Sequence, residues 1–305
     1  MKKITKYLRH PSFIFLFLDK KRILTLKDDT FVKLKYKEMM NRTLNLKEPK
    51  TFNEKIQWMK LYNKNPNYTK MVDKFEVKNY VSNIIGDKYI IPTIGIYNNF
   101  DDINFEELPE KFVLKCTHDS GSTIICKNKN KFNIDEAKKK IIKSMKTNFY
   151  YMGREWAYKD VKPRIIIEAY MQEEGKNELT DYKFMCFNGK VECSFVCLNR
   201  TSEDGLNVDF YDKNWKKMPF ERHYKNSNII LDKPSNYDLM IELAEKLSKD
   251  IPFVRVDFYD IDGKIYFGEL TFYPGCGFEE FNPEEWDKKL GDLIKLPKKE
   301  EKNEK

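Results

Sequence analysis

The chain has 305 residues, of which 41% are hydrophobic and 34% are charged, so it can form a large core and is unlike a disordered protein. Its formal net charge of +8 favours anionic partners. The excess lysine is scattered and forms no basic stripe or nucleic-acid module, so we expect no nucleic acid partner.

Six cysteines favour a reducing, cytoplasmic setting. None forms a CxxC pair, metal-ligand spacing is absent, and a disulfide framework is not expected in a chain of this size. Several lie in predicted strands, where a free cysteine behaves as a small hydrophobe. The six are Cys116, Cys126, Cys186, Cys193, Cys197 and Cys276.

The N-terminus has an apolar run, residues 13–18, between two groups of basic residues. Six apolar residues are too few for the core of a signal peptide or for a membrane span. The basic flanks allow a peripheral contact between residues 1–22 and an anionic membrane surface. The alternative, which we prefer from the sequence, is a short element packed on the body of the protein.

The pattern along the chain predicts an α+β protein. Residues 27–100 are mostly helical, with helices expected over 35–41, 51–62 and 72–85 before a strand-like stretch at 89–96. Short strands follow, interrupted by a Lys-rich helix over 135–146 and a helix over 235–247. The expected strands are 112–116, 123–126, 165–168, 182–187, 190–199 and 207–211, and a closing helix is expected within 283–295.

Residues 255–277 predict a β-hairpin with acidic residues on one face. A three-residue loop ending in a left-handed glycine pairs Asp257 with Phe267 and Arg255 with Glu269. In this register one face is shared by Arg255, Asp257, Glu269 and Thr271. A two-residue loop would place the two acids on opposite faces. Two carboxylates beside an arginine resemble a magnesium–phosphate site, and the alternative is a solvated face with a cross-strand Arg–Glu pair.

Two segments offer lysines for phosphate. Asp73 and Lys74 stand at a predicted helix start, where they could equally be an ordinary solvated pair. Residues 111–126 contain a strand that ends in Lys115 and a loop of small residues whose N–H groups can cradle phosphate. The spacing is not that of a Walker A loop. His118 could contact phosphate or substrate, or be a surface polar group.

Two further segments could complete a nucleotide site. Residues 164–171 predict a buried strand, at whose exit Glu168 and backbone groups could bind an adenine edge, although a core strand needs no such function. Asn188 and Gly189 predict a tight hairpin turn. On the strand before it, Lys183 projects from one face, where it could reach phosphate or simply be solvated.

The order of these segments resembles the ATP-grasp superfamily, and more narrowly its TupA-like branch, named for teichuronopeptide biosynthesis in bacterial surface-polysaccharide clusters. The resemblance spans about residues 46–280, nearly the whole folded chain. The ordered set is more specific than any single motif. The segments are residues 46–58, 111–116, 154–158, 162–164, 181–184 and 268–275.

The resemblance implies an ATP-grasp fold, in which two antiparallel-sheet subdomains grip ATP. The implied divisions are a mostly helical N-terminal region over 1–104, a lid over 105–170, a C-terminal subdomain with the metal site over 171–297, and a disordered tail over 298–305.

The resemblance also implies roles for individual residues. Mg²⁺ is expected on Asp257 and Glu269, with Arg255 and Lys183 as catalytic residues. The expected ATP contacts are Lys74, Lys115, Ser120, Gly121, Ser122, Glu168, Ala169, Tyr170, Met171 and Lys183. The candidate substrate contacts are His118, Arg154, Tyr158 and Thr271, with Glu155 and residues 53–55.

Two positions depart from the family pattern. Thr271 stands where ATP-grasp enzymes often have asparagine, and threonine is a poorer metal ligand. Asp119 lies in the small-residue loop, where it would crowd phosphate unless it turns away or meets a metal. Both departures leave the number of magnesium ions open.

The implied reaction is ADP-forming ligation of an amino acid or other amine to a carboxylate, such as a uronic acid of a surface glycan, through an acyl phosphate. One alternative is a glycosyltransferase that uses a nucleotide sugar, which alternating parallel strands and helices would favour. The other is a binding module that keeps the fold without turnover. Release of ADP distinguishes the three.

Overall fold

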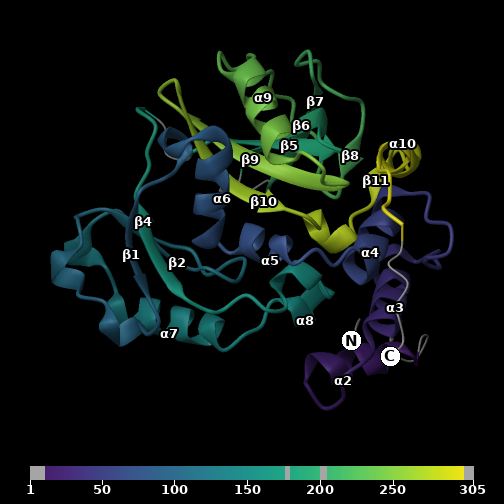
Figure 1. Ribbon diagram of the computed structural model, residues 1–305, viewed down its shortest axis with the longest axis horizontal. Coiled ribbons are helices and arrows are strands. Elements are labelled where there is room, and N and C mark those ends of the chain that lie inside the picture. The colour runs from purple at the N-terminus through teal and green to yellow at the C-terminus, as the bar shows by residue number, and fades with distance from the viewer. Residues whose placement is uncertain (1–10, 176–178, 200–204, 299–305) are drawn as a thin grey trace.

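The computed structural model describes residues 11–175, 179–199 and 205–298, and it has the α+β architecture expected from the sequence (Figure 1). A four-stranded sheet and a five-stranded sheet face each other, and helices pack around both. All strand pairs in the described ranges are antiparallel. The described part of the chain therefore does not have the alternating parallel strands and helices that would favour a nucleotide-sugar transferase.

Helices form the N-terminal part of the chain, as predicted. They are α2 (Phe13–Lys20), α3 (Asp28–Met40), α4 (Phe52–Tyr62), α5 (Asn67–Val72) and α6 (Glu76–Ile85). Thr51 and Glu54 form a capping box at the start of α4. The helix predicted over residues 72–85 is confirmed over Glu76–Ile85, but its predicted start is wrong, because Val72 is the last residue of α5. Asp73 Oδ1 accepts hydrogen bonds from the N–H groups of Phe75 and Glu76, at 2.8 and 3.1 Å, so α6 begins anew there.

The small sheet has its own hydrophobic core. Its strand order is β1-β4-β2-β3, and α7 (Ile134–Met145) covers it with buried Ala137 and Ile141. The strands are β1 (Thr93–Tyr97), β2 (Phe112–Cys116), β3 (Ile124–Cys126) and β4 (Ile165–Ala169). Because β1 pairs with β4, a strand that precedes the predicted boundary at residue 104 joins the sheet of the proposed lid.

The large sheet shares a second core with the N-terminal helices. Its order is β10-β9-β5-β6-β7, with α9 (Tyr237–Leu247) on one side and α4 and α5 on the other (Figure 1). The strands are β5 (Asp181–Phe187), β6 (Lys190–Leu198), β7 (Asn207–Asp212), β9 (Phe253–Ile261) and β10 (Lys264–Thr271). Asn188 and Gly189 take positive φ of 51° and 80°, which confirms the predicted tight turn between β5 and β6.

Short elements complete the chain. Strands β8 (Glu221–Arg222) and β11 (Phe281–Asn282) form a small pair, and α8 (Tyr150–Gly153) and α10 (Glu285–Leu293) pack on neighbouring helices. The 3₁₀ turns are Asp87–Tyr89, Phe100–Asp102, Phe105–Glu107, Lys129–Lys131, Trp156–Tyr158 and Pro274–Gly277. None of the helices in the described ranges is long and apolar enough to cross a bilayer.

The β9–β10 hairpin differs from the prediction in its loop. Ile261 pairs with Lys264, so the loop has two residues, Asp262 and Gly263, both with positive φ (50° and 76°). Alone, this loop would separate the two acids. A β-bulge between Phe267 and Glu269 shifts the register by one residue and places Glu269 opposite Asp257, so the predicted pairs Asp257–Phe267 and Arg255–Glu269 are wrong but the two acids share one face.

The bulge lies at Gly268, where the two strands approach closely. A Cβ added to this glycine would lie 3.2 Å from the carbonyl oxygen of Asp257 and 3.2 Å from Cε2 of Tyr259. An isolated glycine within a strand pattern is a typical signal of a bulge. The predicted three-residue loop is therefore wrong, but the predicted shared face of the two acids is confirmed, because two departures from the expected register compensate.

Candidate active site

Asp257 and Glu269 lie opposite each other on β9 and β10, and Arg255 joins them. Arg255 Nε and Nη2 lie 2.7 Å from Asp257 Oδ1 and Oδ2, and Nη2 lies 2.5 Å from Glu269 Oε1. Asp257 is only 1% exposed. Three carboxylate oxygens from two strands therefore converge on one cationic group.

Lys183 enters the same cluster from β5, the strand on the other side of β9. Its Nζ lies 2.5 Å from Asp257 Oδ2 and 3.2 Å from Asp181 Oδ2. Burial by itself would lower the pKa of Lys183, but the attraction of Asp257 and Asp181 outweighs it and the pKa is raised. Lys183 therefore stays protonated in the folded protein.

Glu269 is held as a carboxylate by the surrounding cations. Its side chain is 48% exposed, whereas that of Arg255 is 12% exposed. The surrounding protein would raise the pKa of Glu269, but Arg255, Lys183 and Lys74 together lower it below the usual value. Thr271 Oγ1 donates to Glu269 Oε1 at 3.0 Å, so this hydroxyl orients the acid.

The donor set fits a magnesium ion that is completed by phosphate and water. Asp257 and Glu269 already direct their oxygens at a common point, and carboxylate oxygens are the ligands that Mg²⁺ prefers. No group of three or more His, Cys, Asp or Glu side chains suited to a metal occurs in the described ranges. The protein therefore offers two acidic ligands here, a number that suits a metal shared with a nucleotide.

Lys74 follows the cap of α6 and faces the loop after β2. Its Nζ donates to the carbonyl oxygen of Asp119 and lies 3.8 Å from the carboxylate Oδ1. Burial lowers the pKa of Lys74, although Asp119 opposes that shift. The hydroxyls of Ser122 and Ser144 both donate to the Asp119 carboxylate. Asp119 has therefore turned into the protein, which relieves the crowding of phosphate expected from the sequence.

The residues predicted to bind phosphate in the loop after β2 differ in exposure. The side chain of Ser122 is buried and also accepts from the N–H of Cys116 at 2.8 Å, so its hydroxyl supports the loop. Ser120 and Gly121 are exposed, and Gly121 has a φ of 103° that favours glycine. Their backbone groups, not the Ser122 hydroxyl, are the parts of the loop accessible to a ligand.

His118 is buried, so the alternative of a surface polar group is wrong. Its Nε2 lies 3.2 Å from the carbonyl oxygens of both Ser144 and Thr147. These carbonyls belong to the end of α7 and the residues that follow it. His118 thus ties the loop after β2 to α7.

A charged triad of one buried acid and two partly buried lysines lies between the two sheets. Glu168 on β4 is 2.5 Å from both Lys115 on β2 and Lys78 on α6. Burial by itself would raise the pKa of Glu168, but the two lysines outweigh it and hold the pKa below its usual value. Sequence reasoning missed Lys78, although its position one helical turn after Lys74 was a usable signal.

A cavity of about 50 Å³ connects this triad with the β9–β10 hairpin. Drug-sized ligands generally occupy pockets of roughly 300 Å³ or more, so this cavity is a closed cleft. Its lining residues come from α6, both sheets and the segment before β1. They are Lys74, Val77, Lys78, Ile90, Ile91, Lys115, Glu168, Tyr259, Phe267 and Gly268.

The predicted adenine segment follows the triad at the end of β4. The N–H of Ala169 donates to the carbonyl oxygen of Pro92 at 3.0 Å, and the chain leaves the sheet after this residue. Tyr170 and Met171 are partly exposed, and Lys111 Nζ lies 5.9 Å from the Tyr170 ring centre. Of the predicted adenine segment, Glu168 lines the cleft and the three residues after it do not.

Arg154 lies apart from the acids and is almost fully buried, at 1% exposed. Its Nη2 lies 2.7 Å from Asp19 Oδ1, and its Nε lies 3.2 Å from Asp28 Oδ1. The guanidinium also stacks on Phe31, 4.2 Å from the ring centre. This environment gives Arg154 a structural role in holding α2 and α3 and leaves almost none of it accessible to a substrate.

Tyr158, in contrast, lies near the acid cluster. Burial raises its pKa well above the ordinary value, Glu155 and Glu269 raise it further, and Arg255 opposes them. Glu155 is itself buried, with Oε1 2.7 Å from Cys276 Sγ, and burial raises its pKa. Of the substrate candidates, Tyr158 and Thr271 therefore adjoin the acids, whereas Arg154 does not.

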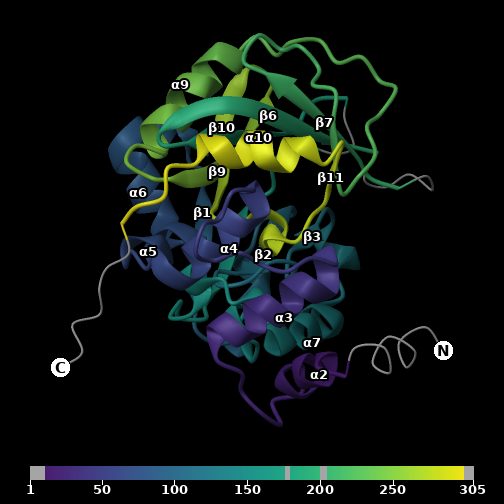
Figure 2. The same cartoon turned by 90° about the vertical axis from the view of Figure 1, so that its right-hand side faces the viewer.

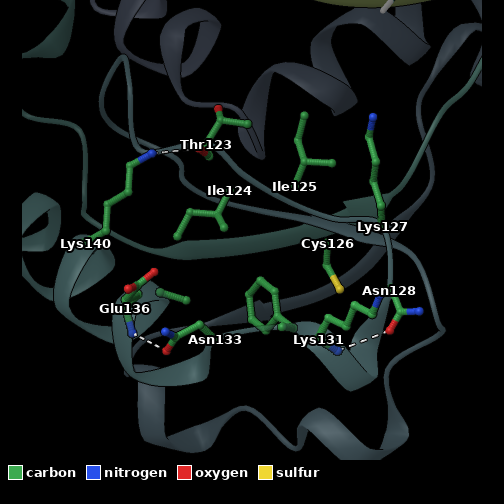
Figure 3. Close-up of a pocket in the computed structure, with 12 residues that line it drawn as sticks. Thr123, Ile124, Ile125, Cys126, Lys127, Asn128, Lys131, Asn133, Glu136 and Lys140 are labelled. Carbon is green, nitrogen blue, oxygen red and sulfur yellow. Dashed lines mark hydrogen bonds between the residues drawn. The ribbon is translucent and has the colours of Figure 1, made fainter. Parts of the chain in front are cut away.

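A larger hollow of about 480 Å³ lies on the small sheet, between β3 and α7 (Figure 3). Lys140 Nζ donates to the carbonyl oxygen of Thr123 at one edge, and Asn133 caps α7 through the N–H of Glu136 at another. None of the acids or lysines described above lines this hollow. It is therefore separate from the candidate active site.

Two antiparallel sheets, with a cation-lined cleft and paired acids between them, are the arrangement expected of an ATP-grasp protein. A sequence model of the family described as TupA-like ATPgrasp matches residues 54–295. The chain therefore belongs to the TupA-like ATP-grasp family. A search of curated proteins finds no match.

Solved structures with some similarity to this chain include several ATP-grasp ligases. ATP-grasp ligase PsnB with its minimal precursor is 9% identical, with a TM-score of 0.38, and the match covers 72% of this chain and 58% of PsnB. D-alanine–D-alanine ligase from Bacillus anthracis with ATP is 17% identical, with a TM-score of 0.35 and coverage of 64% and 54%. The chain thus spans little more than half the length of these proteins, and such distant similarity gives no information on its substrates.

Proposed function

We propose that the chain is an ATP-dependent carboxylate–amine ligase that forms ADP. The observation that supports this most directly is the convergence of Asp257 and Glu269 on one cation, beside a cleft lined by lysines. Paired carboxylates next to fixed ammonium groups suit a magnesium–polyphosphate substrate. The family membership agrees with this proposal.

In this proposal the predicted site residues keep distinct roles. Asp257 and Glu269 would hold Mg²⁺, which would supply charge neutralisation at phosphate oxygens. The phosphates lie among the ammonium groups of Lys74, Lys115 and Lys183, which then exchange their present carboxylate and carbonyl partners for phosphate oxygens. The loop backbone at residues 120–122 covers the phosphates, and the segment 168–171 borders the adenine.

The proposed reaction has two steps. A carboxylate oxygen of the first substrate attacks the γ-phosphorus of ATP, the bond from that phosphorus to the bridging oxygen breaks, and ADP leaves with the electron pair. The amine nitrogen then attacks the acyl carbon, the bond from that carbon to the phosphate oxygen breaks, and inorganic phosphate leaves while the nitrogen loses a proton. Arg255 would neutralise charge on the substrate carboxylate and on the acyl phosphate.

The closed cleft requires the two sheets to separate before ATP can enter. The cavity of about 50 Å³ is far smaller than a nucleotide pocket. We propose that residues 105–170, together with β1, which belongs to the same sheet, move as a lid over the body formed by residues 171–297. The separate hydrophobic core of the small sheet would let that sheet move as a unit. Closure after binding would then exclude water from the acyl phosphate.

For the substrates we propose a sugar carboxylate of a bacterial surface polysaccharide and an amino acid or other amine, joined in the cytoplasm. Tyr158 and Thr271 adjoin the acid cluster and are the best placed of the substrate candidates. His118 would act through the loop it anchors. Arg154, which contacts the N-terminal helices, would contribute only through the fold.

The test is ADP release from MgATP with and without uronic acids and amino acids. A ligase releases ADP only when a carboxylate substrate is present, and it turns over repeatedly only when the amine is present as well; Asp257→Asn or Glu269→Gln lowers the rate by about 100-fold or more. The matched control is Asp260→Asn, which changes an acid on the same strand whose partner is Asn236. ATP binding without ADP release under every combination would identify a binding module, and hydrolysis of a nucleotide sugar in place of ATP would identify a transferase.

A further inference from the structure

Helix α2 presents an apolar face to solvent. Phe13, Leu16 and Asp19 are buried on its inner side. On the outer side, Ile14 is 48% exposed and Phe15 is 47% exposed, and Leu18 lies on the same side, one turn from each. Exposed apolar residues scattered singly are ordinary, but a helix face made of them is typical of an interaction surface.

This face is held firmly on the outside of the molecule. Asp19 Oδ1 accepts from Arg154 Nη2 at 2.7 Å and from the N–H of Leu26 at 2.8 Å. The side chains of Asp19 and Arg154 are both buried. Figures 1 and 2 both place α2 at one end of the molecule, beyond α3. Because the buried pair fixes the inner side, rotation of the helix to hide its apolar side would break the ion pair with Arg154.

The net positive charge of the sequence is concentrated in the segment that contains this helix. Residues 1–27 contain eight Lys or Arg residues and a single acid, Asp19. The remaining 278 residues contain 48 Lys or Arg and 47 Asp or Glu, so they are nearly neutral. Almost the whole net charge of +8 thus belongs to one short segment.

The described cations of this segment are exposed, and the nearby acids have partners. Lys20, Lys21, Arg22 and Lys27 are all exposed. Asp28 and Asp29, which begin α3, pair with Arg154 and Lys33 respectively. Arg22 stacks over the Tyr151 ring at 4.0 Å, next to Met152, which is 62% exposed. The apolar face is therefore bordered by positive charge.

We propose that α2 and the basic residues around it dock the protein on an anionic lipid surface. An apolar helix face enters the boundary between headgroups and acyl chains, and lysines beside it bind anionic headgroups. A protein partner would need its own matching acidic border, whereas an anionic leaflet supplies this charge everywhere along its surface. The inference does not depend on the proposed ligase activity, since α2 contributes no residue to the cleft.

The test is flotation of the full-length protein with vesicles of phosphatidylcholine, with and without phosphatidylglycerol. The wild-type protein should bind the anionic vesicles and dissociate as NaCl is raised. Ile14→Ser with Phe15→Ser should lower the partition coefficient at least about tenfold, from the loss of apolar burial. Lys20→Ala and Lys21→Ala should each lower it about fivefold, and only for anionic vesicles.

The matched control is Ile125→Ser with Ile230→Ser, which removes two exposed aliphatic side chains far from α2 in sequence and should leave binding unchanged. Thermal melting and ADP release in solution should be unaffected in the α2 variant. Wild-type protein that ignores phosphatidylglycerol, or an α2 variant that still binds, overturns the proposal. A wild-type dimer that dissociates in the α2 variant also overturns it, because a second copy would then cover the face.

Discussion

Arg255→Ala tests whether this arginine occupies the position that a metal ion takes when ligands bind. The guanidinium contacts both acids, so Mg²⁺ would compete with it for Asp257 and Glu269. Removal of Arg255 should therefore destabilise the protein in the absence of Mg²⁺. Mg²⁺ should also raise the Tm of the variant by more than it raises the Tm of the wild type.

The magnitude follows from the burial of the partners. Removal of one partner from a buried ion pair costs about 3–5 kcal/mol. Asp257 is almost fully buried but keeps Lys183 at 2.5 Å, so we expect the lower end, ~3 kcal/mol. Loss of the contact with Glu269 adds little to this cost, because about half of the Glu269 side chain is exposed. In a chain of this size ~3 kcal/mol corresponds to a fall in Tm of about 6 °C.

The assay is thermal unfolding followed with and without MgCl₂, at matched ionic strength in NaCl. A metal at 100 times its Kd stabilises a folded protein by about 2.7 kcal/mol, so saturating Mg²⁺ should restore most of the loss in the variant. The Tm of the wild-type protein should rise by less than about 1 °C when MgCl₂ is added. The matched control is Arg222→Ala, which removes another buried arginine, paired with Glu279, and should lower Tm without any response to Mg²⁺.

Two results would refute this reasoning. An equal response to Mg²⁺ in the wild type and in Arg255→Ala would mean that the arginine does not compete with the metal. A response that survives in the double variant Arg255→Ala with Asp257→Asn would mean that the metal binds elsewhere. Either result would remove the two-carboxylate site from the proposed mechanism.

Four further outcomes follow from the same structure. The pKa of Glu168 is lowered in the folded protein, so this acid stabilises the fold fully above its unfolded pKa near 4.5. That stabilisation is lost as the pH falls through the lower folded pKa. In acid unfolding followed by circular dichroism, Glu168→Gln should not show this loss of stability. Gly268→Val should destabilise the protein by about 1–3 kcal/mol in urea unfolding, because its Cβ meets backbone at 3.2 Å. Arg154→Met should cost about 3–5 kcal/mol, measured in the same way, without a specific change in the KM for the substrate carboxylate. Burial and then Glu155 raise the pKa of Cys276 to about 12, so iodoacetamide should modify this thiol roughly a thousandfold more slowly than a free cysteine; mass spectrometry should show faster modification in Glu155→Gln.

Local patterns were sufficient for most of the fold. The strand–turn–strand signal at Asn188 and Gly189 and the capping box at Thr51 act within a few residues, so the sequence alone determines them. The short helix α5 was not predicted, and the start of α6 was placed too early, because apolar spacing extends back to Val72 while Asp73 caps the helix that follows. Periodicity reports which face of an element is apolar, and it does not report where a side chain interrupts the helix.

The site was predictable as a set of residues but not in its pairings. Alternation along β9 and β10 predicted the shared face of the acids, although the real register depends on a short loop and a bulge at Gly268 that compensate. The contacts of Glu168 with Lys78 and Lys115 join a strand to a helix and to another strand, and no local pattern encodes such distances. Arg154 was misjudged for the same reason, because its partner Asp19 lies 135 residues away in sequence.

The ligand-free site pairs its cations with its own anions. Glu168 neutralises Lys115, Asp257 neutralises Lys183, and Arg255 joins both acids. Each buried charge therefore has a partner, which avoids the large penalty of an unpaired charge in a closed cleft. In the proposed function, Mg²⁺ would replace the cations beside the acids, and phosphate would replace the carboxylates beside the lysines. Each buried charge would therefore keep a partner of opposite sign when the nucleotide binds. The pairing of Glu168 with Lys78 and Lys115 explains how these ionised groups can line a cavity of about 50 Å³, and why loss of one partner should destabilise the protein before any chemistry occurs.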